Sequence, residues 1–212
     1  MIILSTSFFP PVQYFTHLFA IQNVLIEACE FYQKKTYRNR YLIYGANGII
    51  PLSVPVEKSN NPKQLIKDVR VSYDMAWNET HWKTIESAYN SSPYFLYYED
   101  EIRMIFMKKW NFLFDMNIAS INAIENCLEI KTNISLTTTY QPSGFYKEDL
   151  REVIQPKIHT DRDKNFIPVE YRQIFALKHG FIPNLSILDL LFNKGPETLL
   201  ILERGYVNLF NS

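Results

Sequence analysis

The chain has 212 residues, a length that suits a single domain, and 47% of them are hydrophobic and 15% aromatic. Its 22 basic and 22 acidic residues give a formal net charge of zero. A neutral chain has no overall field that attracts nucleic acid or an anionic membrane, so we expect no nucleic-acid partner, and any anion site must be local.

Cysteine usage and the N-terminus bear on the compartment. Cys29 and Cys127 are the two cysteines, too few for a disulfide framework, which favours the cytoplasm. The opening MIILSTSFFPP lacks the basic start of a signal peptide. No apolar run approaches the roughly 20 residues that span a bilayer. We therefore expect a cytoplasmic protein without a transmembrane segment.

The first half of the chain predicts strands with one helix between them. Residues 2–4 and 23–27 are apolar enough for buried strands, and residues 12–20 have helical spacing of apolar side chains. A strand, a helix and a second strand in succession predict parallel pairing. Residues 40–45 and 49–57 predict a hairpin around Asn47-Gly48, because both turn residues tolerate positive φ. Residues 67–73 alternate polar and apolar and predict a half-buried strand.

The second half changes to helical patterns. Residues 77–129 predict three helices, broken by Pro93. Residues 134–139 predict a short strand, and 141–168 a mobile loop with a short helix near 147–154. The C-terminal part predicts three more helices, the second starting at Asn184 or Ser186. Together these patterns predict an α/β fold of mixed α+β character. A small N-terminal mixed sheet with helices is covered by a helical block at 76–130, within one domain spanning 1–212.

A basic segment places four cations between residues 34 and 40. Arg38 and Arg40 are two apart, so in a strand they share a face and can grip one phosphate or carboxylate. Lys35, Tyr37 and Asn39 accompany them as candidate ligand contacts. The alternative is a solvated hairpin edge, where lysines discourage edge pairing.

Glu27 ends the second predicted strand, and ligands of open α/β sheets bind at the carboxyl ends of strands. A carboxylate there is a candidate general base. The alternative is a surface carboxylate, with Glu30 beside it, that pairs with Lys34 or Lys35. Cys29 lies between the two carboxylates, but no Cys-His motif supports a nucleophile.

His81 lies between Trp77 and Trp82 in the sequence. It is a candidate general acid or base beside a ring-shaped ligand, on which Trp77, Trp82 and Tyr94 would stack. The alternative is a histidine hydrogen-bonded in the core of an amphipathic helix. None of the four histidines has metal-ligand spacing, and there is no glycine-rich cofactor loop, so we predict neither metal nor cofactor.

Three polar residues interrupt the apolar stretch 184–192. Ser186 and Asp189 are three apart and share a helix face. Helix capping explains Asn184 and Ser186, whereas Asp189 among leucines suggests a ligand contact or a buried partner for Arg38 or Arg40.

Five stretches resemble the WbqC-like family in matching order: FFPPVQYF (8–15), IEACEFYQKKTYRNRYLI (26–43), GIIPLSVPV (48–56), WNETHWKTIESAYNSSPYF (77–95) and HGFIPNLSILDLLFNKGPE (179–197). The resemblance implies a bacterial protein associated with surface-polysaccharide (O-antigen) gene clusters, and hence with nucleotide-activated or lipid-linked sugars. Many members carry a His-Gln-Pro motif after the first strand. Leu4-Ser5-Thr6 stands there in this chain, which argues against nucleotidyl transfer.

Three hypotheses follow. The first is a transferase acting on an activated sugar in polysaccharide biosynthesis, with acyl or aminoacyl transfer to an amino sugar as one form. In it, Arg38 and Arg40 bind the anionic ligand, a sugar nucleotide or similar, and His81 or Glu27 is the base. The second is a non-catalytic binding or scaffold module in envelope assembly. The third pairs the arginines with Glu27, Glu30 or Asp189 in a buried network. The oligomeric state is not predicted.

Overall fold

A four-stranded parallel sheet forms the N-terminal part of the computed structural model, which describes residues 2–207. Its strands are β1 (Ile2–Ser5), β2 (Asn23–Glu27), β5 (Asn133–Leu136) and β6 (Glu148–Asp149), in the order β5-β2-β1-β6. Helix α1 (Val12–Ala20) connects β1 to β2. The predicted parallel pairing is confirmed, with Ser5 opposite Glu27 at the carboxyl end of the pair.

The hairpin lies outside this sheet. Strands β3 (Arg40–Gly45) and β4 (Gly48–Ser53) pair antiparallel, and Gly48 adopts a φ of 105° in the turn. Parallel and antiparallel strands combined with helices confirm the α/β class with mixed character, although the antiparallel pair forms its own two-stranded sheet.

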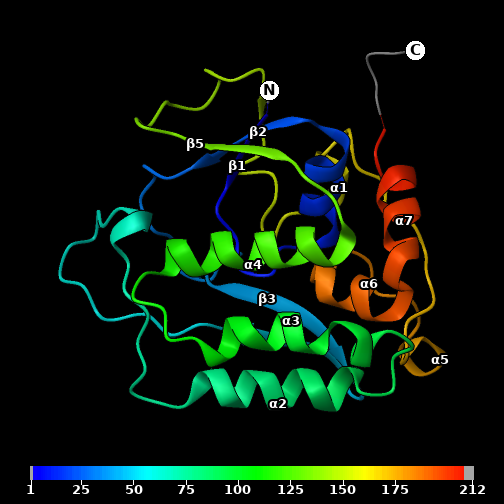
Figure 1. Cartoon of the computed structure of the whole chain (residues 1–212). Coiled ribbons are helices and arrows are strands. Elements are labelled where there is room, and N and C mark those ends of the chain that lie inside the picture. The colour runs from blue at the N-terminus through cyan, green and yellow to red at the C-terminus, as the bar shows by residue number, and fades with distance from the viewer. Residues whose placement is uncertain (1, 208–212) are drawn as a thin grey trace.

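Three helices form the helical block: α2 (Trp77–Tyr89), α3 (Phe95–Met107) and α4 (Leu113–Leu128). Figure 1 shows them side by side, with α4 nearest the parallel sheet. Phe9 from the loop after β1 stacks on Phe106 of α3, with ring centroids 5.4 Å apart. Aromatic packing therefore joins the block to the N-terminal part, and the buried apolar side chains form one cluster that includes both sheets and the helices.

The C-terminal helices are α5 (Ala176–His179), α6 (Ile187–Lys194) and α7 (Thr198–Gly205), with short 3₁₀ turns at η1 (Ile66–Asp68), η2 (Thr160–Arg162) and η3 (Gly195–Glu197). Ser186 caps α6, because its Oγ accepts a hydrogen bond from the Leu188 amide. Helix α7 packs against α1 (Figure 1).

Two sequence predictions are wrong. Residues 67–73 form the η1 turn and isolated bridges at Arg70 and Val71 in place of a strand, because their partners are single residues rather than a neighbouring strand. The short helix expected near 147–154 is absent there, where β6 instead pairs with β1. A two-residue edge strand is too short for a periodicity, so the sequence pattern could not reveal it.

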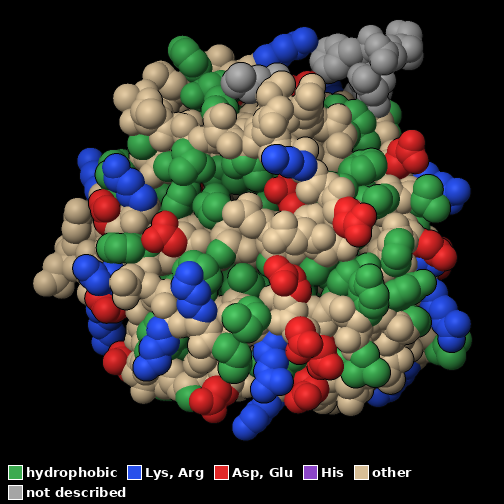
Figure 2. All heavy atoms as spheres, viewed as in Figure 1, with side chains coloured by type: hydrophobic (Ala, Val, Ile, Leu, Met, Phe, Trp, Pro, Cys, Tyr) green, Lys and Arg blue, Asp and Glu red, His purple; other side chains and the backbone are tan. Residues whose placement is uncertain are grey.

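Charges of both signs are interspersed with hydrophobic side chains on the face seen in Figure 2. In residues 2–207, no helix combines the length and the apolar character needed to cross a membrane.

Candidate functional site

The carboxyl ends of β1 and β2 bring charged side chains together. Ser5 and Glu27 close these strands opposite each other, and the chain leaving β2 carries Glu30 past the same edge. In open parallel sheets ligands bind outside the carboxyl ends of the strands, so this edge is where a site is expected.

Glu30 is held there by Arg38. The Arg38 Nε donates to Glu30 Oε1 at 2.8 Å, and its Nη2 donates to Glu30 Oε2 and, at 2.8 Å, to the Ser5 hydroxyl. Ser5 in turn donates to Glu30 Oε2 at 3.0 Å. Burial raises the pKa of Glu30, and the hydrogen bonds and charge of Arg38 oppose that shift. The carboxylate is therefore fixed in position but more basic than an ordinary glutamate.

Glu27 is fully buried, and both of its oxygens are occupied. Oε1 accepts hydrogen bonds from the Cys29 amide at 2.9 Å and from the Thr137 hydroxyl, and Oε2 accepts one from Arg151 Nη1 at 2.8 Å. A carboxylate with these partners organises its neighbours. Both Glu30 oxygens also have partners, but Glu30 borders the pocket described below and Glu27 does not. We therefore regard Glu27 as a positioning residue and Glu30 as the better candidate base.

Arg151 joins the two halves of this edge. It donates from Nε and Nη2 to the two Asp149 oxygens at 2.9 and 2.6 Å, and its guanidinium lies 5.0 Å from the Tyr140 ring centroid. The hydrogen bonds to Asp149, with the charges of both carboxylates, raise the pKa of Arg151. Arg151 is not among the site residues that the sequence predicts, because it follows β6, a strand that the sequence does not predict.

A pocket of about 120 Å³ opens beside these groups. Its polar walls come from Glu30, Gln33, Tyr140, Asp149, Arg151 and Glu152. Three carboxylates face one guanidinium, so the pocket, named here the carboxylate pocket, has a negative balance of charge. A negative pocket favours an ammonium group or sugar hydroxyls over a phosphate.

The basic segment does not form the predicted anion grip. Arg38 turns inward onto Glu30 and is 1% exposed, whereas Arg40 lies on the hairpin with its Nε donating to the Ser53 hydroxyl at 3.1 Å. Asn39 donates to the Val54 carbonyl at 2.9 Å, and Lys35 is exposed in a left-handed turn with φ 64°. Tyr37 lines a hollow of about 10 Å³ together with Arg38, room for about one water molecule. The third hypothesis, a buried network that pairs the arginines with carboxylates, is confirmed for Arg38 and Glu30.

His81 lies in an aromatic environment. Its Nδ1 is 3.2 Å from the Tyr41 hydroxyl, and its ring contacts Trp77 and Phe106 edge-on. It is 6% exposed, and burial lowers its pKa to about 4. The neighbours of Arg38 are instead Glu30 and Ser5. The first hypothesis needs His81 beside the ligand of Arg38 and Arg40, but the His81 ring is oriented into the core and shares no partner with Arg38.

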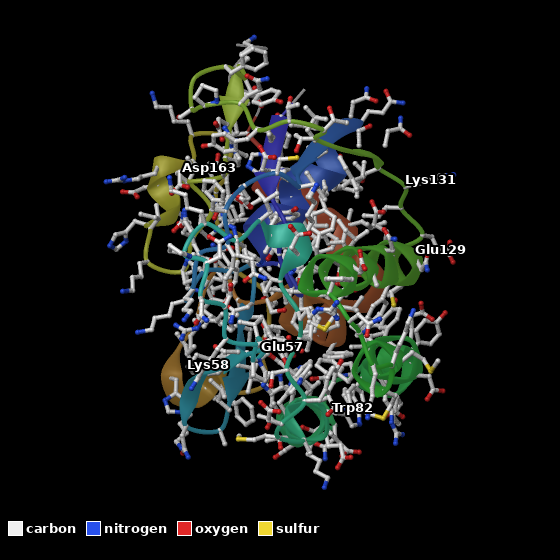
Figure 3. The ribbon with its side chains drawn as sticks, turned by 90° about the vertical axis from the view of Figure 1, so that its left-hand side faces the viewer. Glu57, Lys58, Trp82, Glu129, Lys131 and Asp163 are labelled. Atoms are coloured by element: carbon white, nitrogen blue, oxygen red, sulfur yellow. The ribbon has the colours of Figure 1, made fainter. Side chains whose placement is uncertain are left out.

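The candidate stacking residues pack against the protein itself. Trp82, labelled in Figure 3, stacks on Phe95 with centroids 6.0 Å apart, and Trp77 packs against Tyr73. The Tyr94 ring lies against Gly195, where a Cβ atom would come within 2.4 Å of it. These contacts account for the three aromatics as packing.

Asp189 has neutral partners. Its oxygens accept hydrogen bonds from the hydroxyls of Tyr89 and Tyr171 at 2.9 and 2.7 Å and from Gln173 Nε2 at 2.8 Å. Burial raises its pKa to about 6. The expected pairing with Arg38 or Arg40 is wrong. Asn184, whose φ is 54°, exchanges two hydrogen bonds with Gln13, and Ser186 donates to the Phe9 carbonyl.

One further buried network escaped sequence analysis. His17 Nε2 lies 2.7 Å from Asp163 Oδ2, which also accepts from Gln13 Nε2 at 2.8 Å; Asp163 is labelled in Figure 3. Although burial opposes it, hydrogen bonding and charge from His17 hold the pKa of Asp163 below its usual value. The network fastens the end of η2 to α1. Across residues 2–207, no group of three His, Cys, Asp or Glu side chains could hold a metal ion.

Comparison with known proteins places the chain in a family. The model of the WbqC-like protein family matches residues 6–162 and 163–201. An uncharacterized protein of Mycobacterium tuberculosis (strain ATCC 25618 / H37Rv), Rv1507c, is 26% identical over 217 residues, covering 92% of this chain and 94% of that protein. No solved structure matches. Since the family match runs from residue 6 to residue 201 and includes the helical block, this chain belongs to the WbqC-like protein family.

Proposed function

We propose that this protein is a transferase that acts on an activated, nucleotide- or lipid-linked sugar in bacterial surface-polysaccharide biosynthesis. The reaction we favour is transfer of an acyl or aminoacyl group to an amino sugar. The observation that carries the proposal is Glu30, a buried carboxylate with a raised pKa that borders the carboxylate pocket at the carboxyl edge of the parallel sheet.

Glu30 supplies the base. A general base works best when its pKa lies near the operating pH, and burial moves this carboxyl in that direction. Ser5 and Arg38 fix its two oxygens, so its reach into the pocket is set by the fold. In the reaction Glu30 takes the proton from the attacking amine or hydroxyl, which bonds to the acyl carbon while the bond from that carbon to the donor's carrier group breaks. Glu30 then returns the proton to the carrier group that leaves. Glu27 accepts a hydrogen bond from Arg151 and so positions that arginine in the wall of the carboxylate pocket.

The charge balance of the pocket supports an amine acceptor. Glu30, Asp149 and Glu152 attract an ammonium group and accept hydrogen bonds from sugar hydroxyls, while the Tyr140 ring offers an apolar face to a sugar ring. Both cysteines are free thiols, which fits a protein acting in the reducing cytoplasm.

The test is turnover with a panel of nucleotide-linked amino sugars and acyl or aminoacyl donors. Glu30→Gln keeps the size of the side chain and removes the base, so we expect turnover to fall by a factor on the order of 10² or more. Circular dichroism must show that the variant stays folded, because it also breaks the buried ion pair with Arg38. Glu86→Gln, an exposed glutamate on α2, is the matched control and should leave the rate unchanged. Equal rates for wild type and Glu30→Gln, or no turnover of any panel member by the wild type, would contradict the proposal.

A non-catalytic binding or scaffold module is the second candidate. One surface favours it: Leu96, Tyr97 and Met104 on α3 are 78%, 76% and 65% exposed, an apolar stripe of the kind that partner proteins cover. In cells, a module would lose polysaccharide assembly when Leu96 and Met104 are changed to lysine and keep it in Glu30→Gln. The transferase predicts the reverse pattern.

A further inference from the structure

A second, larger hollow lies on the other side of the segment that carries Glu30. Glu30 and Gln33 line the carboxylate pocket, whereas Tyr32 and Lys34 line a pocket of about 490 Å³. The Tyr32 amide donates to the Gln64 carbonyl at 2.9 Å, which fixes the segment against the loop that forms the far wall.

That far wall carries the second cation. It includes Lys58, Ser59, Asn60 and Asn61, in the cyan loop that projects on the left of Figure 1; Lys58 is labelled in Figure 3 beside Glu57. We call this hollow the lysine pocket.

The lysine pocket has the opposite charge balance to the carboxylate pocket. Lys34 and Lys58 outnumber the one acid on its wall, Glu57. Among residues 2–207 neither ammonium group forms an ion pair with a carboxylate. An unpaired cation on each side of a concave surface is an arrangement that binds phosphate oxygens by charge-assisted hydrogen bonds.

The Tyr32 ring forms part of the wall of the lysine pocket. Its hydroxyl oxygen is buried and has no hydrogen-bond partner among the described residues. Burial raises the pKa of Tyr32 to about 12, so the phenol keeps its proton at neutral pH. The hydroxyl oxygen is therefore closed off from the pocket, and Tyr32 contributes its ring to the wall.

Size separates the roles of the two pockets. The carboxylate pocket, at about 120 Å³, accepts a fragment of a sugar but not a nucleotide-linked sugar. The lysine pocket, at about 490 Å³, lies within the range of roughly 300–1,000 Å³ that is typical of small-molecule sites. The remainder of a large substrate must lie outside the first pocket, and the second is its neighbour across one segment.

We propose that the lysine pocket binds the diphosphate group of the activated sugar, with Lys34 and Lys58 contacting the phosphate oxygens. This proposal rests on the proposed function and extends it. One substrate then crosses the segment 30–34. Its anionic end lies in the lysine pocket, and its amine end lies beside Glu30 in the carboxylate pocket. Opposite charges on the two sides orient the substrate and disfavour the reversed pose.

Titration calorimetry with uridine diphosphate, which carries the phosphates without a sugar, tests the site directly. The double variant Lys34→Ala/Lys58→Ala should weaken binding by about tenfold or more, because two charge-assisted contacts are lost. Lys63→Ala is the matched control, since Lys63 is exposed on the same loop but does not line the pocket. Tyr32→Phe should leave binding unchanged, and raising the salt concentration should weaken wild-type binding.

The outcomes separate this proposal from the transferase itself. Absence of uridine diphosphate binding, or equal affinity in the double variant and the wild type, overturns the phosphate site even if Glu30 proves essential for turnover. Lysine-dependent binding that persists in Glu30→Gln supports it, also when no transfer reaction is found. Loss of binding in Lys63→Ala equal to that in the double variant would show a diffuse charge effect and also overturns it.

Discussion

Arg38 holds both carboxylate oxygens of Glu30, with Nε 2.8 Å from Oε1 and Nη2 bonded to Oε2. The two residues are eight positions apart, on either side of the turn that leads into the hairpin. The basic segment that suggested an anion site therefore supplies one arginine that positions a carboxylate. Its exposed Lys34 contributes to a different pocket.

Removing Arg38 should destabilise the fold. Arg38→Met leaves the Glu30 carboxylate buried without its partner, and breaking a buried pair in this way costs about 3–5 kcal/mol. Urea unfolding monitored by circular dichroism measures the change. Arg40→Ala, at a half-exposed arginine of the same segment, should cost about 0.5 kcal/mol or less. The double variant Glu30→Gln/Arg38→Met should be more stable than Arg38→Met; equal stabilities would contradict a buried ion pair.

Asp189 should make the protein more stable as the pH falls from neutral. Its folded-state pKa of about 6 exceeds the unfolded value of about 3.9, so between these pH values the folded state holds more protons, and acid stabilises it. The contribution is roughly 3 kcal/mol over the whole window. Urea midpoints of wild type and Asp189→Asn at pH 7, 6 and 5 measure it. The wild type should gain relative to the variant at each step, and parallel curves would argue against a raised pKa.

The contribution of His81 to the pH dependence of stability should have the opposite sign to that of Asp189. Its folded-state pKa of about 4 lies below the unfolded value of about 6.5, so the unfolded state holds more protons in this window. Wild-type stability relative to His81→Phe should therefore decline as the pH falls from 6.5 to 4, by roughly 3 kcal/mol. Nitrogen NMR of the ring, assigned with the variant, should show a neutral imidazole at pH 5.5. A protonated ring at that pH would place His81 in a more polar setting than the core.

Gly195 tests the packing of Tyr94. Its φ of 53° is unfavourable for other residues, and a Cβ there would lie 2.4 Å from the Tyr94 ring. Gly195→Ala should cost about 3 kcal/mol, the sum of backbone strain and overpacking. Gly144→Ala is the control, because Gly144 also has positive φ, 91°, but no atom within 4 Å of the added Cβ. It should cost about 1 kcal/mol. Similar losses for both variants would contradict close packing on Tyr94.

Local patterns predicted much of the fold. The bounds of α1 and β2, the Asn47-Gly48 hairpin and the start of α6 at Ser186 all match, because each depends on spacing or turn chemistry within a few residues. The site was predicted less well. Glu27 and Arg38 were placed near the correct sheet edge, but Arg151 and Asp149 approach it from more than 100 residues away. No local pattern records that approach.

Sequence patterns were sufficient for the α/β class, the parallel pairing of the first two strands and the family, since these depend on periodicity and on ordered motifs. Which groups pair with the buried charged side chains depends on the tertiary structure. Arg38 forms an ion pair with Glu30, and Asp189 accepts hydrogen bonds from two tyrosines and a glutamine. Such partners are needed because burial penalises any charge or polar group that the fold leaves without one. Which partner satisfies each group depends on side chains brought together by packing, and spacing along the chain does not encode it.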